Sequence, residues 1–211
     1  MSRFAFSGHE VLLSRPAEPD RLLDDPGVLA WNARDDYMPY WAYLWPGAFL
    51  LAEAVAREPW TAGQSALEIG CGLGLAGLVA LQRGLNVRFT DYDEAPLRFL
   101  ERSAAENGFD PSRYSTGWLD WRDLPAERYP VILGADVLYE QRLVPLVANL
   151  IATMLAPGGL ALIAGPYRVA AEHFPAALEP LGLSAEATAL EMPATELGLV
   201  RGTVYRVRRR G

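Results

Sequence analysis

The sequence predicts an α/β fold, in which a doubly wound, mostly parallel sheet of seven strands carries helices on both faces and ends in an antiparallel hairpin. Three observations predict this class. Short apolar runs alternate with stretches of helical length across residues 46–168, which is typical of a parallel sheet covered on both faces. A glycine-rich loop links the first apolar run to a helix, as ligand-binding loops of such folds do. The last two strand candidates have no helix between them, so they are expected to pair antiparallel.

The segment ahead of this alternation is interpreted as an extension. Residues 15–39 mix proline, aspartate, arginine and aromatic side chains without a clear period, so a mostly irregular structure is expected there. We therefore divide the chain into an N-terminal extension, residues 1–39, and a folded domain, residues 40–211. A length of 211 residues with 51% hydrophobic content suits a single core.

The elements of the domain follow in a regular order. A helix is expected to begin at Pro46 and to continue to about Glu58, because the first helical position needs no N–H donor. The helix at 95–107 has Asp93 as its expected cap and Asn107-Gly108 as its stop signal. The other helices are expected at 74–83, 143–156 and 169–181. The parallel strands are expected at 65–69, 86–90, 114–119, 131–135 and 160–164, and the final pair at 185–191 and 202–208.

The charged residues exclude several functions. All 19 basic residues are arginine, and with 26 acidic residues the formal net charge is −7. Without lysine the chain has no phosphate-loop lysine, no Schiff base and no lysine nucleophile. The acidic balance argues against a nucleic-acid partner, and the basic run of Arg206 and Arg208 to Arg210 is interpreted as the end of a solvated strand.

Location and metal binding are also bounded by composition. The single cysteine, Cys71, has no disulfide partner in the chain, and the first residues lack the apolar stretch of a signal peptide, so a cytoplasmic protein is expected. Residues 143–165 carry no charge, but Pro157-Gly158-Gly159 divides them, so they are interpreted as core and no membrane partner is expected. Two histidines in all predict no histidine-rich metal site. We expect a monomer or a weak oligomer.

The strongest local signal is the loop Gly70-Cys71-Gly72-Leu73-Gly74, which follows the first parallel strand. Glycines at this place let the backbone turn tightly and approach a ligand. Gly72, Gly74 and Gly77 also fit the dinucleotide pattern, with Asp91 at the spacing of a ribose-binding acid. The loop by itself therefore leaves a dinucleotide and other nucleoside cofactors open.

Glu68 distinguishes between these cofactors. It lies in an otherwise apolar strand, where an unpaired carboxylate would cost several kcal/mol or change its pKa. The phosphates of a dinucleotide would repel this acid, whereas a cofactor that carries an ammonium and a sulfonium would not. The alternative is that backbone amides or an arginine pair with Glu68.

With this loop the sequence resembles the class I S-adenosylmethionine-dependent methyltransferases, whose first motif is an acid followed by G-x-G-x-G, as in Glu68, Gly70, Gly72 and Gly74. The resemblance covers about residues 40–211 and implies a Rossmann-like fold with S-adenosylmethionine as cofactor. In this family the acid that ends the second strand holds both ribose hydroxyls, and Asp91 matches it.

The resemblance also implies an adenine site. Tyr92 is placed to touch the adenine, Asp120 to accept its amino group, and Trp121 to stack on the ring. Packing against the sheet remains the alternative role for Tyr92 and Trp121, and a solvent-facing position the alternative for Asp120. Asp93 is expected to cap the next helix.

Asp136 and Tyr139 follow the fourth parallel strand, at the edge of the sheet where ligands bind in such folds. This Asp-x-x-Tyr resembles the signature of the seven-β-strand protein lysine methyltransferases, and the aromatic run 39–47 resembles the same group, especially the branch acting on the electron-transfer flavoprotein β subunit. The resemblance implies that Asp136 orients the incoming amine and that Tyr139 contacts it. Val137 and Leu138 stand where DNA adenine methyltransferases have two prolines, which argues against a flipped base as substrate.

Aromatic residues are concentrated between Trp31 and Trp45. A cationic amine or sulfonium beside such a ring gains about 0.5–2 kcal/mol. Trp41 is expected to contact the substrate and Trp45 the cofactor, whereas Trp31 and Tyr43 are interpreted as packing residues.

The sequence therefore predicts an S-adenosylmethionine-dependent N-methyltransferase that methylates lysine side chains of a protein substrate. Three alternatives remain open. They are a methyltransferase for a small, nicotinamide-like amine, an NAD-binding oxidoreductase, and a cofactor-binding regulatory protein without turnover.

Overall fold

The computed structural model describes residues 1–35, 37–194 and 196–210. Its strands are β1 (Ser2–Phe6), β2 (His9–Leu13), β3 (Ser65–Ile69), β4 (Asn86–Asp91), β5 (Tyr114–Trp118), β6 (Tyr129–Ala135), β7 (Leu155–Pro166), β8 (Leu183–Ala194) and β9 (Gly198–Arg209). Its α-helices are α1 (Pro26–Asp35), α2 (Pro46–Arg57), α3 (Leu75–Gln82), α4 (Ala95–Glu106), α5 (Leu143–Met154), α6 (Val169–Glu172) and α7 (Phe174–Leu178). Short 3-10 turns lie at Pro19–Asp24, Tyr40–Ala42, Pro111–Arg113 and Glu179–Leu181.

The central sheet has the predicted architecture. Its seven strands are ordered β5-β4-β3-β6-β7-β9-β8. The first five of these run parallel, and β9 pairs antiparallel with both β7 and β8. The α/β class and the C-terminal antiparallel hairpin are therefore confirmed. The loops after β3, β4, β6 and β7 all leave the sheet at the edge where the parallel strands end, which brings the predicted site residues together.

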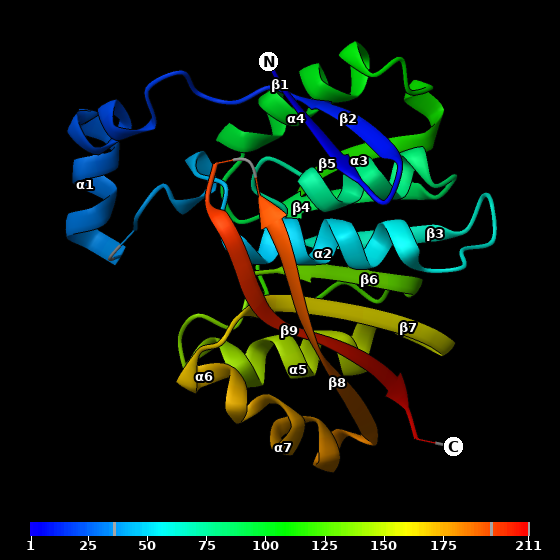
Figure 1. The fold of residues 1–211 in the computed structure, drawn as a ribbon. Helices are drawn as coiled ribbons and strands as arrows, with labels where there is room; N and C mark the ends of the chain where they lie inside the picture. The colour runs from blue at the N-terminus through cyan, green and yellow to red at the C-terminus, as the bar shows by residue number, and fades with distance from the viewer. Residues whose placement is uncertain (36, 195, 211) are drawn as a thin grey trace.

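Helices cover both faces of this sheet (Figure 1). One apolar cluster joins the sheet to α2, α3 and α4, and the other joins it to α5 and α7. The uncharged stretch 143–165 forms α5 and most of β7 and is core, as expected. Within the described residues no helix has the length and apolar character needed to cross a membrane.

A hairpin of β1 and β2, for which the sequence analysis made no prediction, packs on the helices of the first cluster (Figure 1). Its inward side chains Phe4, Phe6, Val11 and Leu13 are buried. The side chain of Asn107, at the end of α4, accepts from the Leu12 amide at 2.8 Å and donates to the Leu12 carbonyl at 2.6 Å. The first strands of the chain therefore share the core of the sheet domain.

Two segments differ from their predicted structure. Residues 26–35 form α1 rather than irregular chain, because Asp25 Oδ1 accepts from the Gly27 and Val28 amides and so caps the helix. The expected helix at 169–181 is divided into α6, α7 and a 3-10 turn. Pro175 and Pro180 stand in this stretch, where each lacks the N–H that a continuous helix needs.

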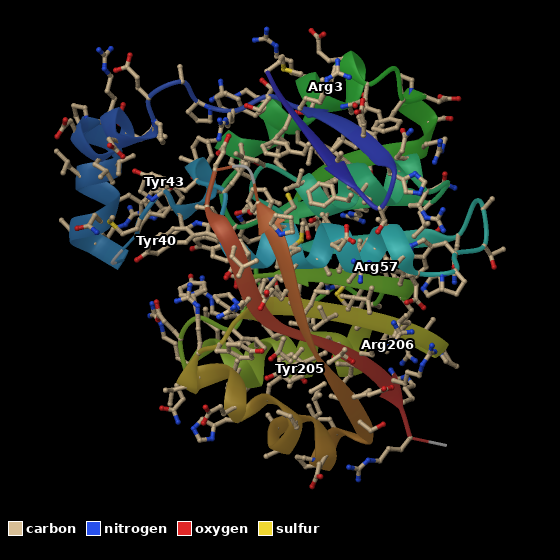
Figure 2. All side chains as sticks on the ribbon, in the orientation of Figure 1. Arg3, Tyr40, Tyr43, Arg57, Tyr205 and Arg206 are labelled. Atoms are coloured by element: carbon tan, nitrogen blue, oxygen red, sulfur yellow. The ribbon has the colours of Figure 1, made fainter. Side chains whose placement is uncertain are left out.

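The basic C-terminal run is used inside the fold. Arg206 on β9 (Figure 2) pairs with Glu58 through both of its terminal nitrogens. Arg209 donates to the carbonyls of Ala152 and Leu155. Because these guanidinium groups hold the end of β9 to α2, α5 and β7, they do not form a free basic patch, which agrees with the acidic balance of the chain.

Replacing Gly77 by alanine is expected to destabilise the protein. A Cβ atom there would lie 2.2 Å from the Phe89 ring and 2.3 Å from Glu68 Oε2, so α3 would have to move off the sheet. The expected loss of unfolding free energy is about 1–3 kcal/mol, measured by denaturant titration. Gly117→Ala is the matched control, because its Cβ would meet only Arg88 at an ordinary 3.6 Å. Equal stability of the two variants would contradict the close approach of α3.

Candidate active site

The glycine loop joins β3 to α3 in a conformation that requires glycine. Gly70, Gly72 and Gly74 have φ angles of +54°, +50° and +75°, in the left-handed region that other residues rarely adopt. The Gly72 amide donates to Asp91 Oδ2 at 2.7 Å, and the Asp93 amide donates to Asp91 Oδ1 at 3.0 Å. The predicted ribose acid therefore lies against the predicted loop.

Burial raises the pKa of Asp91 to about 6, although two backbone amides that donate to the carboxylate act in the opposite direction. Asp93 Oδ1 accepts from the Ala95 amide at 2.7 Å, so the expected capping of α4 by Asp93 is confirmed. The strand end at Asp91 and the start of α4 are thus fixed by one chain of backbone-to-carboxylate hydrogen bonds.

Glu68 lies beneath α3, where its side chain is 2% exposed. Its carboxylate accepts from the Gly77 amide at 3.1 Å, which is the pairing with backbone amides that the sequence left open. Burial raises the pKa of Glu68 to about 8. Through the Gly77 amide Glu68 supports α3 from beneath, and its contact with a cofactor stays a prediction.

The residues expected at adenine are divided between two places. Trp121 and Val137 flank Gly70, since a Cβ there would lie 3.1 Å from the Trp121 ring and 3.3 Å from Val137. The Asp120 carboxylate forms an ion pair with Arg122 at 2.6 Å, and the hydrogen bonds from Arg122 lower the pKa of Asp120. The Arg122 guanidinium also lies 5.5 Å from the centre of the Tyr92 ring.

Tyr92 lines an open hollow of about 450 Å³ at the start of α4, together with Trp31, Asp93, Glu94 and Trp118. The Tyr92 ring centre is 6.1 Å from those of both Trp31 and Trp118. Trp118 is 50% exposed and was not among the predicted site residues. Its position at the carboxyl end of β5, beside Asp91 in the sheet register, was the signal that could have indicated it.

Asp136 follows β6 and joins three elements. Its own amide donates to the Ala164 carbonyl of β7 at 2.8 Å, and its Oδ2 accepts from the Gly47 amide of α2 at 2.6 Å. Its φ of +54° is one of two positive values among the described non-glycine residues. Burial raises the pKa of Asp136 to about 6, whereas the Gly47 amide and the charge of Arg168 act in the opposite direction.

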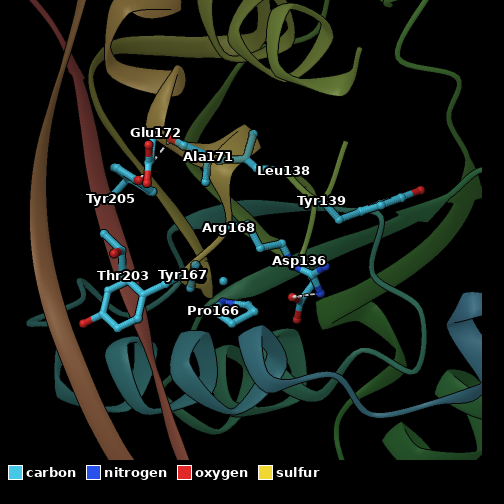
Figure 3. Close-up of a pocket in the computed structure, with 12 residues that line it drawn as sticks. Asp136, Leu138, Tyr139, Pro166, Tyr167, Arg168, Ala171, Glu172, Thr203 and Tyr205 are labelled. Carbon is cyan, nitrogen blue, oxygen red and sulfur yellow. Dashed lines mark hydrogen bonds and ion pairs between the residues drawn. The ribbon is translucent and has the colours of Figure 1, made fainter. Parts of the chain in front are cut away.

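A cavity of about 90 Å³ opens beside Asp136 and Tyr139 (Figure 3). The other polar side chains along it are those of Tyr167, Arg168, Glu172, Thr203 and Tyr205. These residues come from the segment after β7, from α6 and from β9. None of them was predicted as a site residue. Tyr167 and Arg168 directly follow the end of a parallel strand, so the rule that indicated Asp136 also applied to them.

Aromatic rings stand beside this cavity at the surface. The Tyr40 ring centre lies 5.8 Å from that of Tyr139 and 5.9 Å from that of Trp45. Tyr40, which Figure 2 labels on the segment joining α1 to α2, is 44% exposed, Tyr139 38% and Trp45 36%. We call these three residues the aromatic rim.

The two tryptophans have different surroundings, and their contacts with cofactor and substrate stay predictions. Trp45, expected at the cofactor, belongs to the aromatic rim. Trp41, expected at the substrate, lies over the glycine loop, since its backbone would be 3.6 Å from a Cβ at Gly72, and its ring is 5.8 Å from that of Phe99. Trp41 lies within the 3-10 turn Tyr40–Ala42 and Trp45 lies after it, so the two side chains have different neighbours. Their spacing in the sequence did not indicate this difference.

Comparison with known proteins gives three findings. A family model described as lysine methyltransferase matches residues 42–175. The chain is 36% identical over 109 residues to the histidine protein methyltransferase 1 homolog of Dictyostelium discoideum, covering 48% of this chain and 35% of that protein. It is 27% identical over 176 residues to the EEF1A lysine methyltransferase 3 of Mus musculus, covering 82% of this chain and 67% of that protein.

Among solved structures, the fold is similar to that of the ribosomal protein L11 methylase from Lactobacillus delbrueckii subsp. bulgaricus. The TM-score is 0.60 at 18% sequence identity, with 76% of this chain and 77% of that chain covered. The chain thus spans about a third of the length of the first relative and two thirds of the second.

Glu68→Gln is expected to change the pH dependence of stability. The pKa of the Glu68 carboxyl is raised from its ordinary value near 4.5 to about 8 in the fold. The protonated carboxyl therefore makes its full contribution to stability below about pH 4.5, and this contribution is lost as the pH rises through 8. The variant should exceed the parent in unfolding free energy by roughly 3–5 kcal/mol at pH 9 and match it within about 1 kcal/mol at pH 5.

Denaturant titration at both pH values measures this difference. The matched control is Glu127→Gln, an exposed glutamate paired with Arg88, for which no gain at alkaline pH is expected. Parallel pH profiles for parent and Glu68→Gln would contradict the buried, protonated side chain.

Proposed function

The chain belongs to the lysine methyltransferase family, and from this premise we propose that it transfers a methyl group from S-adenosylmethionine to the side-chain nitrogen of a lysine in a protein substrate. The observation that carries the proposal is the position of Asp136. One oxygen of its carboxylate is held by the Gly47 amide, and the other is buried without a hydrogen-bond partner among the described residues. Asp136 lines a cavity together with the exposed aromatic ring of Tyr139. Such an arrangement suits a long aliphatic chain that ends in an amine.

The residues around the glycine loop fit S-adenosylmethionine. Asp91 accepts from the Gly72 and Asp93 amides, and a carboxylate offers about four acceptor sites, so it keeps acceptor capacity for ribose hydroxyls. Trp121 beside Gly70 and Tyr92 beside Asp91 offer aromatic faces for adenine.

When bound, S-adenosylmethionine supplies a methyl group activated by a positively charged sulfur. The protein must hold the acceptor nitrogen in line with that methyl group, and positioning provides most of the acceleration in such a displacement. Val137 links the two halves of the site, because it follows Asp136 in the chain and lies beside Gly70. The second oxygen of Asp136, which has only a long ion pair with Arg168, would accept a hydrogen bond from the amine, and the residues of the glycine loop would hold the methyl donor.

The acceptor amine has to lose a proton before it attacks. A lysine has an ordinary pKa near 10.4, and transfer into a cavity of low polarity favours its neutral form. We assign Asp136 to attract and orient the amine, and Tyr139 to contact its aliphatic chain. The aromatic rim stabilises the incoming ammonium by about 0.5–2 kcal/mol through cation–π attraction.

We further propose that residues 40–211 form the catalytic domain, with residues 1–39 as an extension that completes its core. Asp136, Tyr139 and the aromatic run 39–47 support the branch that resembles the electron-transfer flavoprotein β-subunit lysine methyltransferases. Cytoplasmic location and a monomer or weak oligomer belong to the same proposal.

Labelling tests the acceptor. The purified protein is incubated with tritiated S-adenosylmethionine and cell extract, and we expect label in a protein band that mass spectrometry assigns to lysine. Label on histidine or arginine would contradict lysine as the acceptor residue. Label confined to small molecules would contradict a protein as the substrate. Calorimetry with S-adenosylhomocysteine and with NAD tests the cofactor separately, and binding of NAD alone would contradict the whole proposal.

Two matched asparagine variants should separate the two halves of the site. Asp136→Asn keeps an acceptor for the Gly47 amide and suits a left-handed backbone, but it loses the charge. We expect transfer to fall roughly 100-fold or more, with the dissociation constant of S-adenosylhomocysteine changed less than about threefold. Asp91→Asn should show the reverse order, with cofactor affinity lowered about tenfold or more by weaker hydrogen bonds to ribose.

Calorimetry and initial-rate measurements on the two variants provide this comparison. A large loss of cofactor affinity in Asp136→Asn would make Asp136 a cofactor residue. Unchanged affinity in Asp91→Asn would contradict its assignment to the ribose.

A further inference from the structure

The cavity beside Asp136 already contains a cationic side chain. Arg168, in the segment between β7 and α6, lines the cavity with Asp136 and points toward it (Figure 3). Its Nη2 lies 3.8 Å from Asp136 Oδ1, which is an ion pair but is longer than a hydrogen bond. The proposed acceptor amine and this guanidinium therefore compete for the same carboxylate oxygen.

Neither partner in this pair has its hydrogen bonds satisfied. Asp136 Oδ1 and Arg168 Nε are both buried, and neither has a hydrogen-bond partner among the described residues. A buried charged group left without hydrogen bonds is costly. The cost is removed when a donor approaches Oδ1 to the usual charge-assisted distance of about 2.8 Å. The pair is therefore a weak contact that a better donor can replace.

We propose that Arg168 holds the place of the acceptor's ammonium or amine on Asp136, so that an acceptor binds only if it displaces this guanidinium. The proposal rests on the proposed function and adds a residue that determines acceptor specificity. A cationic or amine donor that reaches Oδ1 gains the hydrogen bond that Arg168 does not make. A neutral side chain without a strong donor leaves Arg168 in place, so the site discriminates against it.

Glu172 supplies an alternative partner for the displaced side chain. Arg168 directly precedes α6 in an extended conformation, and Glu172 ends this one-turn helix, so the two are four residues apart in the chain. Both line the cavity, and Glu172 is exposed. Movement of the guanidinium from Asp136 to Glu172 exchanges one carboxylate for another and opens the inner end of the cavity without leaving Arg168 unpaired.

Binding of n-butylammonium chloride, a mimic of the lysine side chain, tests this exchange on the full chain saturated with S-adenosylhomocysteine. We expect Arg168→Gln to bind n-butylammonium about tenfold more tightly. This factor corresponds to removal of a competing state, with Arg168 paired to Asp136, that holds about nine tenths of the population. Neutral n-butanol, which has the same number of heavy atoms as n-butylammonium, does not compete with the guanidinium for Asp136 and should gain much less affinity from Arg168→Gln than n-butylammonium does. Arg201→Gln, which breaks an exposed ion pair with Glu191 on β9 and β8, is the matched control and should change neither ligand's affinity.

Two further variants distinguish displacement from a change in packing. Arg168→Lys keeps a competing cation and should bind n-butylammonium like the parent. Glu172→Gln removes the alternative partner and should weaken n-butylammonium binding several-fold. With a protein acceptor, Arg168→Gln should lower KM while kcat changes less.

Equal or weaker n-butylammonium binding by Arg168→Gln would overturn the proposal. So would an equal gain for n-butanol, because it would show that only space was created. Failure of the proposed function is detected separately, as a parent protein that binds no S-adenosylhomocysteine or labels no protein, whatever the Arg168 variants do.

Discussion

The carboxylate of Asp136 caps the N-terminus of α2 from 89 positions away in the chain. Trp45, which precedes this helix, offers no capping side chain, and Pro46 has no N–H to satisfy. The first free donor of the helix is therefore the Gly47 amide, and it requires a partner from elsewhere in the fold. Asp136 provides this partner and in return is stabilised by the positive end of the helix dipole.

The rest of the site depends on this contact. A Cβ at position 47 would lie 2.4 Å from Asp136 Oδ2 and 2.8 Å from the Ala164 carbonyl, so only glycine allows α2, β6 and β7 to meet here. With Oδ2 held by the helix, Oδ1 is directed to Arg168. One carboxylate thus has a structural oxygen and, under the proposed function, an oxygen for the acceptor, and its left-handed backbone is maintained by the elements around it.

The three acids of the site differ in how far burial raises their pKa values. Glu68 has one backbone donor, and burial raises its pKa to about 8, so it is a mostly neutral support for α3. Asp91 and Asp136 have backbone donors and pKa values raised only to about 6, so they are mainly charged at neutral pH. Under the proposed function the attraction for a cationic cofactor and an amine would come from Asp91 and Asp136. The excess of acidic residues in the composition does not by itself indicate which acids take part.

The sequence by itself determined the alternation of strands and helices, the glycine loop, and the acids that follow β4 and β6, because these depend on local periodicity and on the rule that parallel strands end at one edge. It also determined the capping of α4 by Asp93, which involves neighbours in the chain. Only the tertiary structure decided which way each side chain is directed. Glu68 turned beneath α3, because the packing of that helix on the sheet sets the direction of its side chain. The rim of Tyr40, Trp45 and Tyr139 and the pair of Arg168 with Asp136 each join segments far apart in the chain, whose approach is set by packing.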